Sequence, residues 1–77
     1  MNIDEKVKHE FKKLGLHIKK LREKRNVSIK ELSKKTGIRK DYLNKIEDGS
    51  AYGVLIERHL LKISKILKIS LYELVDY

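Results

Sequence analysis

The sequence predicts an all-α protein, a compact four- to five-helix bundle. Apolar residues recur at spacings of three and four, there is no proline, and only four glycines interrupt the 77 residues. No segment alternates apolar and polar residues as strands do. With 40% hydrophobic residues in so short a chain, we expect a single domain over residues 1–77 with one small core.

The first predicted helix covers about residues 4–25. One continuous apolar stripe runs along it, with spacings of 4, 4, 3, 4 and 3, at Ile3, Val7, Phe11, Leu14, Ile18 and Leu21. Acidic residues near its start and basic residues near its end match the helix dipole. Gly15 lies inside the helix and costs about 1 kcal/mol relative to alanine. A close backbone contact with another element would explain that glycine.

Two short helices follow. Ser28 and Glu31 form a capping box, in which the hydroxyl accepts one free amide and the carboxylate reaches back to another. Gly37 ends this second helix, because glycine adopts the left-handed conformation at the lowest cost. A third helix is expected from about residue 39 to residue 47, and Gly49 ends it.

The C-terminal part predicts two further helices. After a loop over residues 49–53, a fourth helix is expected over about residues 55–67. Its apolar face contains Ile56, Leu60, Ile63 and Leu67. Ser70 and Glu73 repeat the capping-box pattern and start a short fifth helix.

Residues 28–47 have the pattern of a helix-turn-helix, two short helices joined by a tight glycine turn. Ser33 is small enough to let the two helices approach each other. The second helix of such a motif enters the major groove of DNA, where its N-terminal residues reach the base edges. The predicted base-facing residues are Arg39, Lys40, Asp41, Asn44 and Lys45.

Charge and composition restrict the function classes. A net charge of +8 favours a polyanionic partner, nucleic acid or an anionic membrane surface, although a solvated lysine-rich surface is the alternative. Without cysteine, and with three scattered histidines, we expect no disulfide and no metal site. We also expect no cofactor. No nucleophile, base and orienting group occur together, so we do not expect an enzyme. No signal-peptide core or membrane-spanning run is present, so we expect a cytoplasmic protein with no membrane partner.

Five short patterns occur in an order that is specific when they are taken together: Leu-Arg, Ser-x-x-Glu-Leu, Thr-Gly-Ile, Tyr-Leu-x-x-Ile-Glu-x-Gly and Leu-x-Ile-Ser. With them, the segment from Leu14 to Leu74 resembles the lambda-repressor-like (Cro/repressor) helix-turn-helix family. The resemblance implies a sequence-specific regulator of transcription of prokaryotic or phage type, a repressor, that binds double-stranded DNA. It also implies an ion pair between Arg22 and Glu47. We expect this pair to be structural, because a partly buried pair fixes the relative orientation of two helices.

Several positions depart from the family pattern. Ile29 stands where many members carry a glutamine that touches a phosphate, so that contact is expected to be missing. Arg39 stands where many members carry a serine or threonine cap, so a cap is lost and a cation is gained. Residues 1–13 form an N-terminal helical extension that the usual motif lacks.

Single residues of the motif leave alternatives open. Lys40 and Lys45 suit guanine and Asn44 suits adenine. Asp41 could accept a hydrogen bond from cytosine or simply favour the positive end of the helix. Phosphate contacts are predicted for Lys30, Tyr42, Gly49 and Ser50, the last two through their backbone amides and the Ser50 hydroxyl, and Arg39 is a further phosphate candidate. For Tyr42, packing beside the fourth helix is the alternative.

One helix-turn-helix covers only a half-site, so we expect a homodimer. The segment from Leu55 to Tyr77 is richer in apolar residues than a small core requires, which predicts a dimer surface on the C-terminal helices. The N-terminal helix, through Ile3 and Val7, is the alternative surface. Two other functions remain open, a protein-docking module such as the head of membrane-anchored cytoskeletal proteins, and an antitoxin-type regulator with a protein partner.

Overall fold

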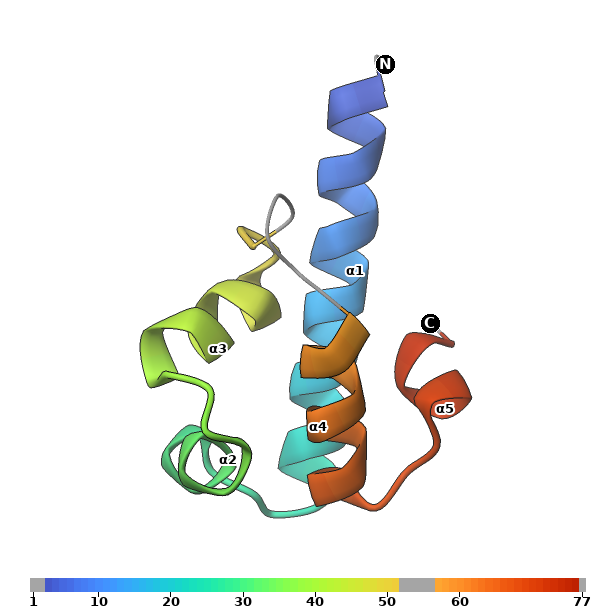
Figure 1. The fold of residues 1–77 in the computed structure, drawn as a ribbon. Helices are drawn as coiled ribbons and strands as arrows, with labels where there is room; N and C mark the ends of the chain where they lie inside the picture. Colours follow the sequence, from blue (N-terminus) through green and yellow to red (C-terminus); the bar gives the residue numbers. More distant parts are fainter. Residues whose placement is uncertain (1–2, 52–56, 77) are drawn as a thin grey trace.

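The computed structural model describes residues 3–51 and 57–76, and these ranges form five helices and no strand (Figure 1). The helices are α1 (Ile3–Lys24), α2 (Ile29–Thr36), α3 (Lys40–Asp48), α4 (Glu57–Leu67) and α5 (Leu71–Val75). The predicted all-α class is confirmed, and the predicted helix bounds agree within about two residues wherever they can be compared. The predicted start of the fourth helix and the end of the loop before it lie outside the described residues.

The predicted caps set the helix boundaries. The Ser28 hydroxyl accepts the amide of Glu31 at 3.0 Å, and Ser70 does the same for Glu73 at 3.0 Å. Gly37 has a φ of 77° and donates its amide to a carbonyl of α2. The Glu31 carboxylate lies against Lys35 at 2.9 Å rather than reaching back to the cap, so the capping box works in one direction only.

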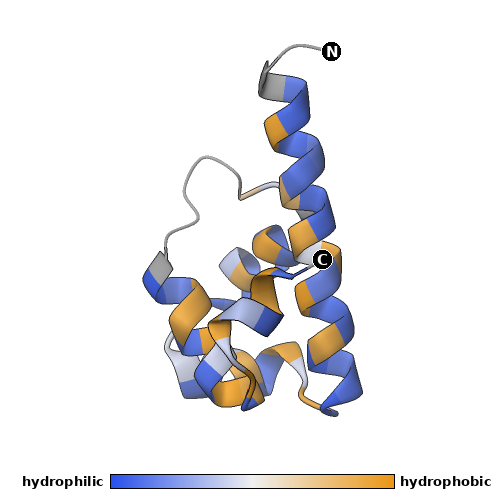
Figure 2. Cartoon of the chain, turned by 90° about the vertical axis from the view of Figure 1, so that its right-hand side faces the viewer, coloured by the Kyte–Doolittle hydropathy of each residue, from blue (hydrophilic) through white to orange (hydrophobic). Residues whose placement is uncertain are grey.

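The core lies between all five helices. In Figure 1, α3 and α5 lie on opposite sides of α1, and α4 lies between them. The apolar faces of the helices turn towards each other, while hydrophilic residues cover most of the outer faces (Figure 2). The fully buried side chains are Ile18, Leu32, Leu43, Ile63, Leu67 and Leu74. The N-terminal part of α1 extends beyond the other helices, so the predicted N-terminal extension is a continuation of α1 (Figures 1 and 2).

Two glycines bring α1 and the end of α3 into backbone contact. A Cβ atom on Gly15 would overlap the carbonyl oxygens of Ile46 and Glu47. A Cβ atom on Gly49 would lie 2.7 Å from the Cα atom of Lys12. The close contact predicted for Gly15 is therefore present, and Gly49 provides a second one from the opposite side.

The C-terminal apolar residues mostly serve the core, which differs from the prediction. Among the apolar residues that were predicted to be more than the core requires, Ile63, Leu67 and Leu74 are buried in the core. Four more are partly buried and pack against the core: Leu60, Ile66, Ile69 and Leu71. The short α5 packs against both α1 and α4, so the core accepts more aliphatic side chains than one helix pair would. Leu61 and Val75 remain exposed.

Two side chains, one from α1 and one from the turn after it, donate hydrogen bonds to backbone carbonyl groups of α5 and α4. Nε2 of His17 donates to the carbonyl of Glu73 at 2.9 Å, and Nε of Arg25 donates to the carbonyl of Leu67 at 2.9 Å. Both carbonyls lie at or near helix ends, where no intrahelical partner is present. No helix within the described ranges is long and apolar enough to cross a membrane.

Candidate nucleic-acid interface

The turn between α2 and α3 is fixed by side chains from within the motif. The hydroxyl of Thr36 donates to the Leu32 carbonyl at 2.7 Å and accepts the amide of Ile38 at 3.2 Å. The hydroxyl of Ser33 donates to the Ile38 carbonyl at 2.6 Å. From the sequence, Ser33 was expected only to be small enough for the two helices to approach each other, and this hydrogen bond across the turn was not predicted. Ile38 itself is buried, so the turn holds α2 and α3 at one relative angle.

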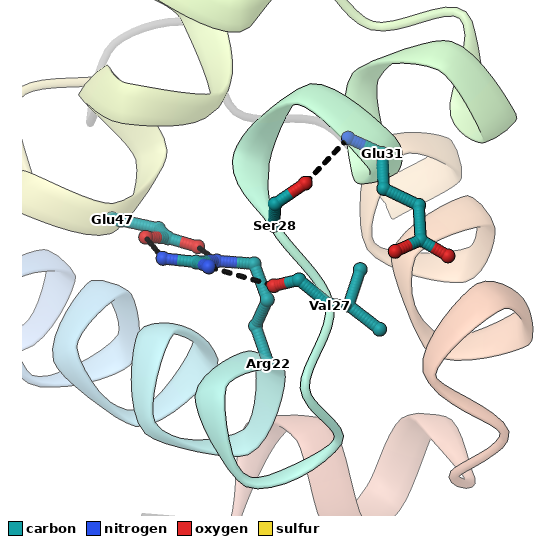
Figure 3. A network of polar contacts seen from close by, with 5 residues as sticks. All are labelled: Arg22, Val27, Ser28, Glu31 and Glu47. Atoms are coloured by element: carbon teal, nitrogen blue, oxygen red, sulfur yellow. Dashed lines mark hydrogen bonds and ion pairs between the residues drawn. The ribbon is translucent and has the colours of Figure 1, made fainter.

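The ion pair between Arg22 and Glu47 joins α1 to α3 (Figure 3). Nε of Arg22 lies 2.7 Å from Oε2 of Glu47, and its Nη2 donates to Oε1 at 3.0 Å. The third guanidinium nitrogen, Nη1, donates to the carbonyl of Val27 at 2.8 Å, in the link between α1 and α2. The two side chains are only 10% and 7% exposed. The hydrogen bond to Glu47 raises the pKa of Arg22 above its ordinary value, so the guanidinium stays charged.

The outer face of α3 carries the predicted base-facing residues. Leu43 and Ile46 point into the core, whereas the exposed residues are Arg39, Lys40, Asp41, Asn44 and Lys45. As expected from its sequence, α3 begins without a side-chain cap at Arg39. Arg39 instead lies 3.7 Å from the carboxylate of Asp41, and both side chains are well exposed. The structure thus brings these five residues together on one solvent-facing surface at the start and middle of α3.

Tyr42 lies at the edge of that surface and packs beside α4, the alternative that the sequence left open. Its ring meets the ring of His59 edge-on, with the centroids 5.0 Å apart. Nδ1 of His59 is buried and has no hydrogen-bond partner within the part of the chain that the structure describes. Burial, and then the charges of Arg58 and Lys62, lower the pKa of His59.

The backbone amides of Gly49 and Ser50, which were predicted to contact a phosphate, donate hydrogen bonds within the protein. The Gly49 amide donates to the Ile46 carbonyl at 3.3 Å. The Ser50 amide donates to the Lys45 carbonyl at 2.9 Å and to the carboxylate of Asp48 at 2.8 Å. Gly49 is also buried against α1, so neither amide is available to an outside ligand. The hydrogen bonds from Ser50 lower the pKa of Asp48, which places a carboxylate beside this turn.

Lys30, the remaining predicted phosphate ligand, is exposed on α2. It lines a shallow pocket together with Ser28, Glu31, Lys34 and Lys35. Three lysines on one helix make this surface electropositive beside the turn. Among the described residues, no group of three or more histidine, aspartate or glutamate side chains could hold a metal ion.

Comparison with known proteins identifies the architecture. A family model of the helix-turn-helix domain matches residues 15–76, which contain the C-terminal part of α1 and all of the other helices. No curated protein and no solved structure matches the chain. The matched residues include the capped α2, the glycine turn, α3 and the ion pair that fixes it. The protein therefore belongs to the helix-turn-helix domain family, in agreement with its resemblance to lambda-repressor-like domains.

Proposed function

We propose that the protein is a sequence-specific regulator of transcription that binds double-stranded DNA through α3. The observation that carries the proposal is the exposed polar face of α3 on a helix whose position is fixed by the Arg22–Glu47 pair and by Gly15. A fixed helix with outward hydrogen-bonding side chains can present them to base edges in the major groove. The net charge of +8 supports a polyanionic partner.

Within this proposal, the residues have different tasks. Lys40 and Lys45 bind guanine edges and Asn44 binds an adenine edge. Lys30 and Arg39 bind phosphates, which position the protein without specifying the sequence. Asp41, which lies beside Arg39, orients that guanidinium and favours the positive end of α3.

The proposed regulator acts as a homodimer and a repressor in the cytoplasm. Exposed apolar side chains on α1 and α5, Leu16, Tyr72 and Val75, support self-association, because exposed apolar surface on a soluble domain can mark an interface. Two-fold symmetry would place the recognition helices about 34–36 Å apart, one turn of DNA, and imply a near-palindromic operator. Occupying a promoter is sufficient to block transcription, which is why we propose repression.

The test is a binding titration over a range of salt concentrations, with selected and random duplexes. Each neutralised phosphate contributes about −0.9 to the slope of log K against log salt, so several contacts give a steep slope. Lys40→Ala should reduce discrimination between selected and random duplexes by about 1–3 kcal/mol at one base pair, whereas Lys30→Ala should weaken all duplexes equally. Absence of binding at low salt would remove the DNA proposal and favour a protein-docking function. Equal uniform losses in both variants would show that α3 does not read bases.

A further inference from the structure

The N-terminal part of α1 lies beside the C-terminal end of the recognition helix. The backbone of Lys12 contacts Gly49, the residue that ends α3. Lys8 precedes Lys12 by one helical turn, and both are exposed. The two lysines line one pocket with Asp48, Gly49 and Ser50. This surface, which we call the α1–α3 corner, joins the N-terminal extension to the end of the motif.

The length of α3 determines which part of the DNA lies next to the α1–α3 corner. Its nine residues span about 13 Å at about 1.5 Å per residue, more than the depth of about 8.5 Å of the major groove. When the N-terminal residues of α3 reach base edges, its C-terminal end therefore lies near the wall of the groove, which is a sugar-phosphate strand. The α1–α3 corner lies at that end.

The chemistry of the corner suits a phosphate through its lysines and not through its backbone. The amides of Gly49 and Ser50 are consumed by hydrogen bonds within the protein. The carboxylate of Asp48 accepts hydrogen bonds from Ser50 that lower its pKa, so it stays ionised and the two lysines leave the corner with a net charge of +1. The positive charge of the corner comes from the ammonium groups of Lys8 and Lys12, and residues four apart on a helix lie on one face.

We propose that Lys8 and Lys12 bind a phosphate of the DNA backbone next to the half-site that α3 reads. This inference rests on the proposed function and adds a contact from the N-terminal extension, which lies outside the matched domain. The contact between Lys12 and Gly49 fixes the lysines relative to α3, so the corner sets how deeply the helix enters the groove. Because the ligand is a phosphate, the contact strengthens binding to every sequence alike.

The experiment compares a double variant with a matched control. Lys8→Ala with Lys12→Ala removes two positive charges at the corner. Lys13→Ala with Lys20→Ala removes two from another face of α1, where these residues lie around Leu16 and His17. All four side chains are exposed, so both proteins should melt like the parent protein. Fluorescence anisotropy with a selected and a random duplex over a range of salt concentrations gives the affinity and the salt slope.

We expect the corner variant to lose about 0.9 in the slope for each bound protomer, because one phosphate is no longer neutralised, and to weaken both duplexes by the same factor. The control variant should keep a slope close to that of the parent protein. If the parent binds DNA steeply but both variants have the same slope, the corner inference is wrong and the proposed function stands. If the parent does not bind either duplex, both fail together. A loss confined to the selected duplex would also overturn the inference, because it would mean base reading.

Discussion

Replacing Arg22 with alanine tests what holds the recognition helix in place. Arg22 makes two hydrogen bonds to Glu47 and one to the Val27 carbonyl, and the two side chains are 10% and 7% exposed. Removing one partner leaves a nearly buried carboxylate without its counter-ion, which costs about 3–5 kcal/mol. At roughly 0.05–0.15 kcal/mol per residue, the whole domain of 77 residues is stable by only about 4–12 kcal/mol.

The expected loss is therefore large enough to see directly. For a domain of this size, 1 kcal/mol shifts Tm by about 4–8 °C, so Arg22→Ala should melt at least about 12 °C below the parent protein. Circular dichroism at 222 nm, with thermal and urea unfolding, measures this. Lys35→Ala is the control, because it breaks the Lys35–Glu31 pair whose side chains are 54% and 41% exposed, worth about 0–1 kcal/mol.

A second variant separates lost contacts from an unpaired charge. Arg22→Met with Glu47→Leu removes both charges and keeps apolar volume, and such replacements are often neutral or stabilising. We expect this double variant to recover much of the stability that Arg22→Ala loses, although the Val27 carbonyl still lacks its donor. A melting temperature for Arg22→Ala that matches Lys35→Ala would refute the reasoning, since the pair would then be no stronger than an exposed one.

Three further predictions follow from other contacts. Gly15→Ala should destabilise the fold by about 1–3 kcal/mol in urea unfolding, because the Cβ atom of alanine would overlap two carbonyl oxygens of α3. This loss should exceed the gain from the better helix propensity of alanine, and a more stable variant would contradict the prediction. The pKa of His59 is lowered from its ordinary value of 6.5, so the neutral side chain contributes to stability above pH 6.5 and this contribution is lost as the pH falls. Tm should therefore fall between pH 7 and pH 5.5, and it should fall less steeply in His59→Phe. Leu16→Glu with Tyr72→Glu should convert the proposed dimer to a monomer in sedimentation without loss of helix content, and a monomeric parent protein would end the dimer proposal.

Local signals in the sequence were sufficient for the helix boundaries. Ser28, Ser70 and Gly37 make their capping contacts within a few residues of themselves, so the pattern alone contains both partners. The pair of Arg22 and Glu47 is separated by 25 residues, and only the resemblance to a known family predicted it.

Contacts between distant segments could not be predicted from the sequence. Gly15 predicted that some backbone would lie close, but its partner at the end of α3 depends on how the helices cross. The same holds for Arg25, which reaches the Leu67 carbonyl 42 residues away, and for His17, 56 residues from Glu73. At the site, the position of Gly49 and Ser50 directly after the third helix predicted a phosphate contact, whereas the folded backbone uses both amides internally.

The hydrogen bonds and close contacts that fix α3 leave its solvent-facing side chains without a part in the fold. Gly15, Glu47 and the buried Leu43 and Ile46 hold the helix from behind, while Lys40, Asp41, Asn44 and Lys45 are exposed. Folding and target choice are therefore encoded at separate positions of one nine-residue helix. A library randomised at the four exposed positions should consist mostly of folded proteins, because exposed substitutions usually change stability by less than about 0.5 kcal/mol. Such a library would let the domain be redirected to new operators, and natural descendants could diverge in target by the same route.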